Sequence, residues 1–166
     1  MIVVDTSAIL AILLGEERGE EFSRHIEDQG PALISAGTAF ELAAVSSRDA
    51  RLLDAAMNFL KQAYVQVEPV ESDQVAIAAE AYSRFGKGHH PAGLNLGDLF
   101  AYALSRHRSL SLLFQGNDFA RTDISPVAGD TQRDAVLSRA DDKDNSPVIH
   151  QRIRSRHSRA SDPRTE

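Results

Sequence analysis

The chain opens with Met1-Ile2-Val3-Val4-Asp5-Thr6-Ser7, and the fold class follows from these seven residues. Ile2 to Val4 form a β-branched run without polar alternation, which predicts a strand buried on both faces, as in a parallel sheet. Asp5 ends this run, and the apolar segment 8–14 that follows predicts a helix. Open α/β sheets bind ligands at the carboxyl ends of their strands, so Asp5 stands where such a fold carries out chemistry. The alternative for Asp5 is a structural role as the cap of that helix.

The rest of the chain alternates between short apolar strands and amphipathic helices. Strands are predicted at 2–4, 32–35, 64–70 and 110–114, with 122–124 as a candidate fifth strand. Helices are predicted at 8–14, 20–28, 38–45, 49–63, 72–85 and 94–107. This alternation predicts one α/β domain over residues 1–126, with a mostly parallel sheet of four to five strands and helices on both faces. Residues 127–166 are polar, and we predict a disordered or weakly helical tail there.

Composition limits the function classes that remain open. The 166 residues contain no cysteine, which excludes disulfides and thiolate zinc sites and fits a reducing cytoplasm. No apolar run is long enough to cross a membrane, and the N-terminus does not resemble a signal peptide. Residues 1–125 carry 17 acidic and 10 basic side chains, unlike a non-specific nucleic-acid binder. A phosphate-bearing substrate would therefore need a divalent cation to neutralise the site.

Four acidic residues begin or interrupt predicted elements: Asp5, Glu41, Asp98 and Asp118. Loops after parallel strands and the starts of the following helices gather at one edge of the sheet, so these carboxylates are expected to converge. Clustered carboxylates repel each other unless they are protonated or bound to a cation, and an oxygen-only site favours Mg²⁺ or Mn²⁺. Each acid also has a structural alternative. Thr38-x-x-Glu41 and Asn95-x-x-Asp98 resemble capping boxes, and Asp118 is placed to cap a turn with Asn117.

Three blocks of sequence together resemble a known family. They are the opening stretch Met1-Ile2-Val3-Val4-Asp5-Thr6-Ser7-Ala8, the segment Gly86-Lys87-Gly88-His89-His90-Pro91-Ala92-Gly93-Leu94-Asn95-Leu96-Gly97-Asp98-Leu99-Phe100-Ala101-Tyr102-Ala103, and Leu112-Leu113-Phe114-Gln115-Gly116-Asn117-Asp118-Phe119. With Glu41 in a helix after the second strand, they resemble the PIN-domain ribonucleases, and in particular the VapC-type toxins of bacterial toxin–antitoxin pairs. The resemblance covers about residues 1–126.

The resemblance implies a three-layer PIN-like fold and a Mg²⁺-dependent endoribonuclease, with Mn²⁺ as the other candidate metal. It implies structured RNA such as tRNA or rRNA as the substrate, a VapB-like antitoxin as a partner, and a homodimer. The metal aspartates of the family match Asp5 and Asp98, its further acids match Glu41 and Asp118, and Ser7 matches a hydroxyl position near the metal. Asn117-Asp118 leaves the register of the fourth acid open, and the segment after Pro126 does not match the family's usual ending.

Two other function classes stay open at this stage. A metal-dependent phosphatase with a phosphoaspartate intermediate also has a strand that ends in Asp, but it typically needs a second Asp where this chain has Ser7. A non-catalytic interaction module of the same fold would bind a partner without cutting it.

Two further groups of side chains, the loop histidines and the phenylalanines, are candidates for a role beside the acids. His89 and His90, near Lys87, would bind phosphate, supply a general acid, or lie in a solvated loop without a role. Phe22, Phe40, Phe85 and Phe100 are predicted to lie in the core.

Overall fold

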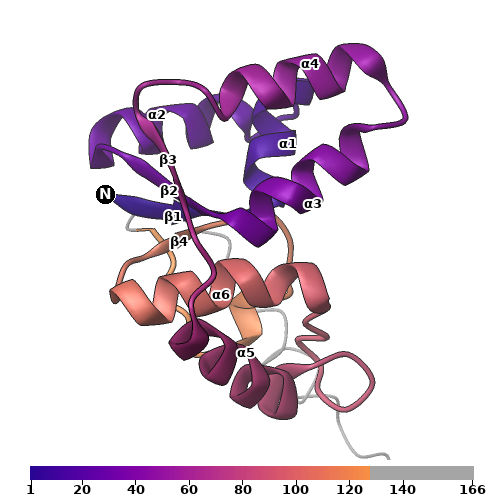
Figure 1. Ribbon diagram of the computed structural model, residues 1–166, viewed down its shortest axis with the longest axis vertical. Coiled ribbons are helices and arrows are strands. Elements are labelled where there is room, and N and C mark those ends of the chain that lie inside the picture. The colour runs from indigo at the N-terminus through magenta and orange to yellow at the C-terminus, as the bar shows by residue number, and fades with distance from the viewer. Residues whose placement is uncertain (128–166) are drawn as a thin grey trace, which may run out of the picture.

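The computed structural model describes residues 1–127 and confirms the predicted three-layer α/β/α architecture around a parallel sheet (Figure 1). The strands are β1 (Ile2–Val4), β2 (Ala32–Ser35), β3 (Val65–Glu68) and β4 (Leu112–Leu113). The helices are α1 (Thr6–Leu14), α2 (Gly19–Gln29), α3 (Ala36–Ser46), α4 (Ala50–Phe59), α5 (Ser72–Phe85) and α6 (Leu96–Arg108), followed by the 3-10 turn η1 (Phe119–Arg121). In Figure 1, α1 to α4 lie above the sheet and α5 and α6 lie below it.

In the strand order β3-β2-β1-β4, strands are added on both sides of β1, so the strand order reverses at β1. The chain first builds outward from β1 through β2 to β3, and then β4 joins β1 on the other side. The register pairs Val3 with Leu33 on β2 and with Leu112 on β4. A crevice outside the carboxyl ends of the strands is expected at such a switch point, directly after Val4.

The two faces of β1 belong to two separate hydrophobic cores, because successive side chains of a strand point to opposite faces. Ile2 and Val4 pack among side chains of α1 to α4, such as Phe22, while Val3 packs among side chains of α5 and α6, such as Leu104. All three strand residues are at most 1% exposed. Burial on both faces explains why the opening run shows no polar alternation.

The helix pair α3 and α6 is held together by a close contact between a glycine and a ring. A side chain on Gly37 would place its Cβ 2.2 Å from the ring of Phe100, so the absence of a side chain lets the aromatic ring lie directly on the α3 backbone. This contact brings the first turn of α3 next to the first turn of α6. The two helices that carry predicted site residues are thereby fixed relative to each other.

Several boundaries differ from the prediction. Residues 122–124 do not form a fifth strand; the chain instead makes a single parallel bridge between Leu112 and Pro126. Helix α4 ends at Phe59, four residues early, because the turn after it tightens into bonds such as Lys61 N–H to the Asn58 carbonyl. Val127, predicted to begin the tail, is buried in the core on the α1 to α4 side. The rest of the predicted tail, 128–166, lies outside the described residues.

The prediction that Phe40 lies in the core is wrong. Phe22 and Phe85 are buried and Phe100 covers Gly37, but Phe40 is 77% exposed on α3. Helix α3 is apolar on most of its circumference, so its sequence does not distinguish the buried face from the exposed one. Within residues 1–127, none of the helices has the length and apolar character needed to cross a lipid bilayer.

Candidate active site

Asp5 lies at the carboxyl end of β1 and is only 4% exposed. Its Oδ2 atom accepts hydrogen bonds from the backbone N–H of Ser7 at 2.9 Å and from the Ser7 hydroxyl at 2.6 Å, so Asp5 does cap α1. The Oδ1 atom is buried and has no hydrogen-bond partner among the described residues. Burial raises the pKa of Asp5, although the two bonds from Ser7 oppose this effect. The cap therefore uses one carboxylate oxygen and leaves the other without a hydrogen-bond partner among the described residues.

Ser7 connects this aspartate to the strand on the other side of the switch point. Its hydroxyl donates to Asp5 and accepts a 2.9 Å hydrogen bond from the backbone N–H of Gln115, just after β4. The hydroxyl of Ser7 thus already makes one hydrogen bond as a donor and one as an acceptor. It orients Asp5, and it is poorly suited to act as a nucleophile.

Glu41 reaches two other elements from α3. Its Oε2 accepts a 2.7 Å hydrogen bond from the Thr6 hydroxyl at the start of α1. On the other side, a Cβ placed on Gly97 would lie 1.8 Å from Oε1, so the carboxylate rests directly against the first turn of α6. The capping box expected for Thr38 and Glu41 does not form, because Ser35 caps α3 instead.

Asp98 forms the predicted capping box with Asn95. The Asn95 side chain accepts from the N–H groups of Gly97 and Asp98, and Asp98 Oδ2 accepts a 2.7 Å hydrogen bond from the Asn95 N–H. Burial raises the pKa of Asp98 to about 7, and the charges of Asp5, Asp118 and Glu41 add to the rise. Asp98 therefore has both a structural role and a strongly perturbed carboxyl group.

Asp118 lies in the loop after β4 and precedes η1. Its side chain makes no capping hydrogen bond to η1, so the turn-capping alternative is not observed. Partial burial raises the pKa of Asp118, while the nearby Arg121 lowers it. Together with the effect of its charge on Asp98, this places Asp118 at the same edge of the sheet as the other acids.

The four predicted site residues, Asp5, Glu41, Asp98 and Asp118, thus form one carboxylate cluster in which the charge of each of the other three raises the pKa of Asp98. They do not converge tightly. Over residues 1–127, no three acidic or histidine side chains form a group arranged to hold a metal ion. Each of Asp5, Glu41 and Asp98 is turned toward a local hydrogen-bond partner instead. The assignment of these residues to a catalytic metal site stays a prediction.

Two contributors to the cluster were not identified from the sequence. Thr6 follows Asp5 in the opening stretch without a predicted role, yet its hydroxyl donates to Glu41, which lies 35 residues further along the chain. Gly97 was not singled out, although a glycine inside the first turn of a helix is unfavourable without a reason. The close approach of Glu41 is that reason, and the glycine in a helical pattern was the available sign of it.

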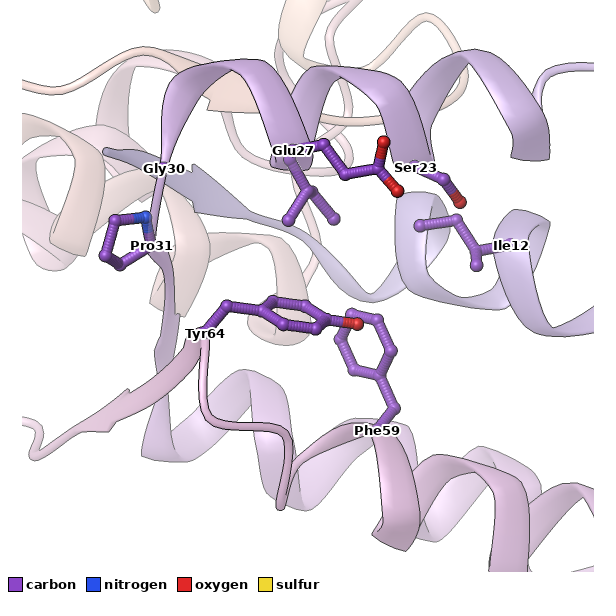
Figure 2. A pocket seen from close by; sticks show the side chains of 8 residues that line it. Ile12, Ser23, Glu27, Gly30, Pro31, Phe59 and Tyr64 are labelled. Carbon is purple, nitrogen blue, oxygen red and sulfur yellow. The ribbon is translucent and has the colours of Figure 1, made fainter.

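A separate cavity of about 420 Å³ lies at the opposite edge of the sheet (Figure 2). Figure 2 shows Tyr64 and Phe59 beneath α2, with Ser23 and Glu27 of that helix above them. The two rings meet edge to face, with their centroids 6.3 Å apart. The carboxylate cluster contributes no residue to the lining of this cavity.

The fold and the carboxylate cluster agree with the family match. Residues 2–125 match the family model of the PIN domain, and the chain belongs to this family. Within it, the chain groups with the VapC proteins. It is 41% identical to ribonuclease VapC42 of Mycobacterium tuberculosis over 131 residues, which cover 75% of this chain and 98% of that protein. It is 40% identical to ribonuclease VapC30 of the same species, over 76% of this chain and 98% of the relative. The resemblance stated from the sequence is confirmed.

Solved structures share the fold of this chain. VapC20 of Mycobacterium tuberculosis, described as a sarcin-ricin loop cleaving toxin, aligns with a TM-score of 0.63 at 22% identity and covers 76% of this chain and 98% of its own. A toxin–antitoxin complex from Klebsiella pneumoniae aligns with a TM-score of 0.56 at 19% identity, over 74% of this chain and 93% of its own. At these identities the structural matches establish the fold only.

Proposed function

We propose that this protein is a Mg²⁺-dependent endoribonuclease, active also with Mn²⁺, that serves as the toxin of a VapC-type toxin–antitoxin pair and hydrolyses phosphodiester bonds in structured RNA. The observation that carries the proposal is the carboxylate cluster at the carboxyl edge of the sheet, where one buried oxygen of Asp5 lacks a partner. The names of the relatives support the choice of RNA, because VapC42 and VapC30 are both ribonucleases.

The chemistry of the donor set fits a hard divalent cation. All four acids offer oxygen ligands, which suit Mg²⁺ and Mn²⁺, and the free Oδ1 of Asp5 is a ligand without a competing hydrogen bond. Asp5 and Asp98 would hold the metal, with Glu41 and Asp118 beside them. A bound divalent ion polarises a phosphoryl oxygen and lowers the pKa of a water molecule, which makes hydroxide available near neutral pH.

The residues of the chain itself position this chemistry. Ser7 and Thr6 hold the carboxylates of Asp5 and Glu41 through hydrogen bonds of 2.6 and 2.7 Å, so these groups do not have to be ordered when the substrate arrives. The capping box keeps Asp98 at the first turn of α6. The uncompensated negative charge of the cluster repels the phosphate backbone until it is neutralised, which makes cleavage dependent on the cation.

The test is cleavage of total RNA by the Asp5→Asn variant in the presence of Mg²⁺. Loss of a metal ligand removes several kcal/mol of transition-state stabilisation, so we expect cleavage to fall by about 10³-fold or more. Asp28→Asn, at an exposed position of α2, is the matched control and should cleave like the wild type. Wild-type cleavage by a folded Asp5→Asn protein would refute the assignment of Asp5.

The antitoxin is the partner we propose for the toxin. Solved structures of the same fold include a toxin–antitoxin complex and VapBC2 from Rickettsia felis, described as bound to a DNA fragment from its promoter. Expression of this chain alone should arrest growth, and Asp98→Ala should relieve the arrest. Equal toxicity of the two forms would disconnect growth arrest from the carboxylate cluster.

We also propose that the toxin forms a homodimer through the N-terminal halves of α3 and α6. Phe40 and Leu96 are 77% and 72% exposed, which is unusual for large apolar side chains. Phe40 directly precedes Glu41, and Leu96 stands two residues before Asp98. Light scattering should give a dimer mass for the wild type and a monomer mass for Phe40→Ser. A monomeric wild type at micromolar concentration would remove this part of the proposal.

A non-catalytic interaction module remains the second candidate, because no three acids in residues 1–127 are arranged to hold a metal. The same RNA assay separates the two functions. A wild-type protein that binds its antitoxin but leaves RNA intact with Mg²⁺ and with Mn²⁺ would favour the interaction module.

A further inference from the structure

The acidic body of this protein raises the question of what holds an RNA backbone next to the carboxylates. Residues 1–125 carry an excess of acidic side chains, and several of the arginines are already paired with carboxylates, such as Arg84 with Asp123 and Arg108 with Glu68. Affinity for nucleic acid comes mainly from basic side chains on phosphates. Basic groups near the cluster that make no ion pair are therefore the place to look.

The glycine-rich loop between α5 and α6 is one side of such a region. Its ends are joined by a bridge between Gly86 and Leu94, with the Lys87 N–H donating to the Leu94 carbonyl at 2.9 Å. Leu94 directly precedes Asn95 of the capping box, so the closed base of the loop abuts the cluster. The side chain of Lys87 is exposed and makes no ion pair with residues 1–127 in this structure.

The two histidines stiffen this loop and do not extend freely into solvent. His89 Nε2 lies 2.7 Å from the Tyr82 carbonyl, and its ring packs edge to face on Tyr82. His90 Nδ1 accepts a 3.0 Å hydrogen bond from the Ala92 N–H, and its ring packs edge to face on Phe85. Both rings are therefore committed to the backbone or to neighbouring rings. They hold the loop in one conformation, which presents Lys87 at a defined place.

Arg121, at the end of η1, forms the other side of this region. Its guanidinium donates a 3.3 Å hydrogen bond to the carbonyl of Pro91 in the glycine-rich loop. Asp118 directly precedes the short 3-10 turn that ends at Arg121, so the two side chains belong to one turn, and the charge of Arg121 lowers the pKa of Asp118. Arg121 is exposed and thus connects the cluster to the loop while its charge faces solvent.

We propose that Lys87 and Arg121 form a phosphate-binding rim that holds the RNA backbone beside the carboxylate cluster. The assignment rests on the proposed ribonuclease function and adds the residues that position the substrate. Two basic side chains beside the acidic cluster would bind the phosphates that flank the scissile phosphate, while the scissile phosphate faces the carboxylates. The rim contacts only phosphates, so it contributes affinity and register without reading the base sequence.

RNA binding by Lys87→Gln and Arg121→Gln, alone and combined, tests the rim. The background is Asp5→Asn, which prevents cleavage, and the probe is a fluorescein-labelled single-stranded RNA titrated at 50 to 200 mM KCl. Each substitution should weaken binding by up to about fivefold, the upper end for an exposed ion pair. Each should also flatten the plot of log affinity against log salt by about 0.7 for a single strand. Lys61→Gln and Arg24→Gln remove exposed charges elsewhere on the surface and serve as matched controls.

The outcomes separate the rim from the proposed function. In the background with Asp5 intact, the rim variants should raise KM for RNA and leave kcat nearly unchanged. If the wild type cleaves RNA but the rim variants match the two controls, the rim is wrong and the ribonuclease stands. If the wild type does not cleave RNA but the rim variants still lose RNA affinity and salt dependence, the rim stands and the nuclease falls. Loss of antitoxin affinity with unchanged RNA affinity would make the region a protein-docking surface and overturn the proposal.

Discussion

The two edges of the parallel sheet are built in opposite ways. At the carboxyl edge, burial raises the pKa of Asp98 to about 7, and the charges of Asp5, Asp118 and Glu41 add to the rise. At the amino edge, a cavity of about 420 Å³ is lined largely by apolar side chains such as Ile26 and Phe59. The carboxyl edge retains an electrostatic cost that folding alone does not relieve, whereas the cavity at the amino edge gathers no such group of carboxylates among its lining residues. Groups kept in an unfavourable environment mark a functional site more specifically than an open apolar volume does.

The largest effect that tests this contrast should come from Gly97→Ala. The added Cβ would overlap with Glu41 Oε1, so the carboxylate must move by about 1 Å or more. Such a displacement costs about 10- to 100-fold in cleavage, while the fold tolerates it because alanine favours the helix. RNA cleavage and thermal unfolding should be measured for Gly97→Ala, Glu41→Gln and the double variant. If Gly97→Ala acts by displacing Glu41, the double variant should cleave RNA no more slowly than Glu41→Gln alone. A loss in the double variant equal to the product of the two single losses would show that Gly97→Ala acts independently of Glu41.

The next effect concerns metal affinity and pH. With a pKa of about 7, Asp98 is mostly protonated at pH 6 and mostly ionised at pH 8. A metal ion requires the ionised form, so the dissociation constant for Mn²⁺ should be about tenfold higher at pH 6 than at pH 8. Titration calorimetry at the two pH values measures this dissociation constant. Asp98→Asn should bind Mn²⁺ more weakly and lose most of this pH dependence, and an unchanged dependence would assign the proton to another group.

A smaller effect is expected on the stability of the metal-free protein. The pKa of Asp98 in the folded state is higher than its ordinary value of 3.8, so the folded state binds the proton more tightly than the unfolded state does. Asp98 therefore contributes stability below about pH 4, and this contribution is lost as the pH rises through about 7.

The free energy of unfolding, measured in urea with EDTA present, should show this pH dependence. At pH 8, Asp98→Asn should be more stable than the wild type by about 2 kcal/mol, discounted for partial solvent access. At pH 5 the difference should be small, and the asparagine can still accept the bond from the Asn95 N–H. A variant that is less stable than the wild type at pH 8 would show that the capping role of the carboxylate exceeds the cost of its charge.

The smallest effect belongs to the amino edge. Ser23→Leu places apolar surface into the cavity and improves helix propensity in α2, so it should stabilise the protein by about 0.5 to 1 kcal/mol. RNA cleavage should not change, because no cluster residue lines this cavity. Unfolding and cleavage assays on the same preparation decide the point. A loss of cleavage would mean that the two edges are coupled and that the contrast between them is incomplete.

The parts of the site that could be predicted from sequence depend on short-range geometry. Asp5 follows a strand that is buried on both faces, and its position at the sheet edge comes directly from that strand. The capping box of Asn95 and Asp98 spans three residues, so its spacing is visible in the sequence. The parallel sheet follows from strands that alternate with helices, because parallel strands need such crossovers.

The parts that could not be predicted depend on how distant elements pack. Thr38 and Glu41 have the spacing of a capping box, but α3 begins at Ala36 and is capped by Ser35, so Glu41 is free to bond to Thr6. Phe40 faces outward because α6 covers another side of an almost uniformly apolar helix.

Hydrophobic periodicity and capping act over a few residues, so the order of amino acids is enough to place particular residue types at the ends of the strands and the starts of the helices. The tertiary structure decided that Glu41 rests between Thr6 and Gly97, and that Lys87 and Arg121 lie on neighbouring segments beside the acids. Those contacts join residues far apart in the chain. They exist only once Phe100 has packed on Gly37 and the sheet has brought its carboxyl ends together.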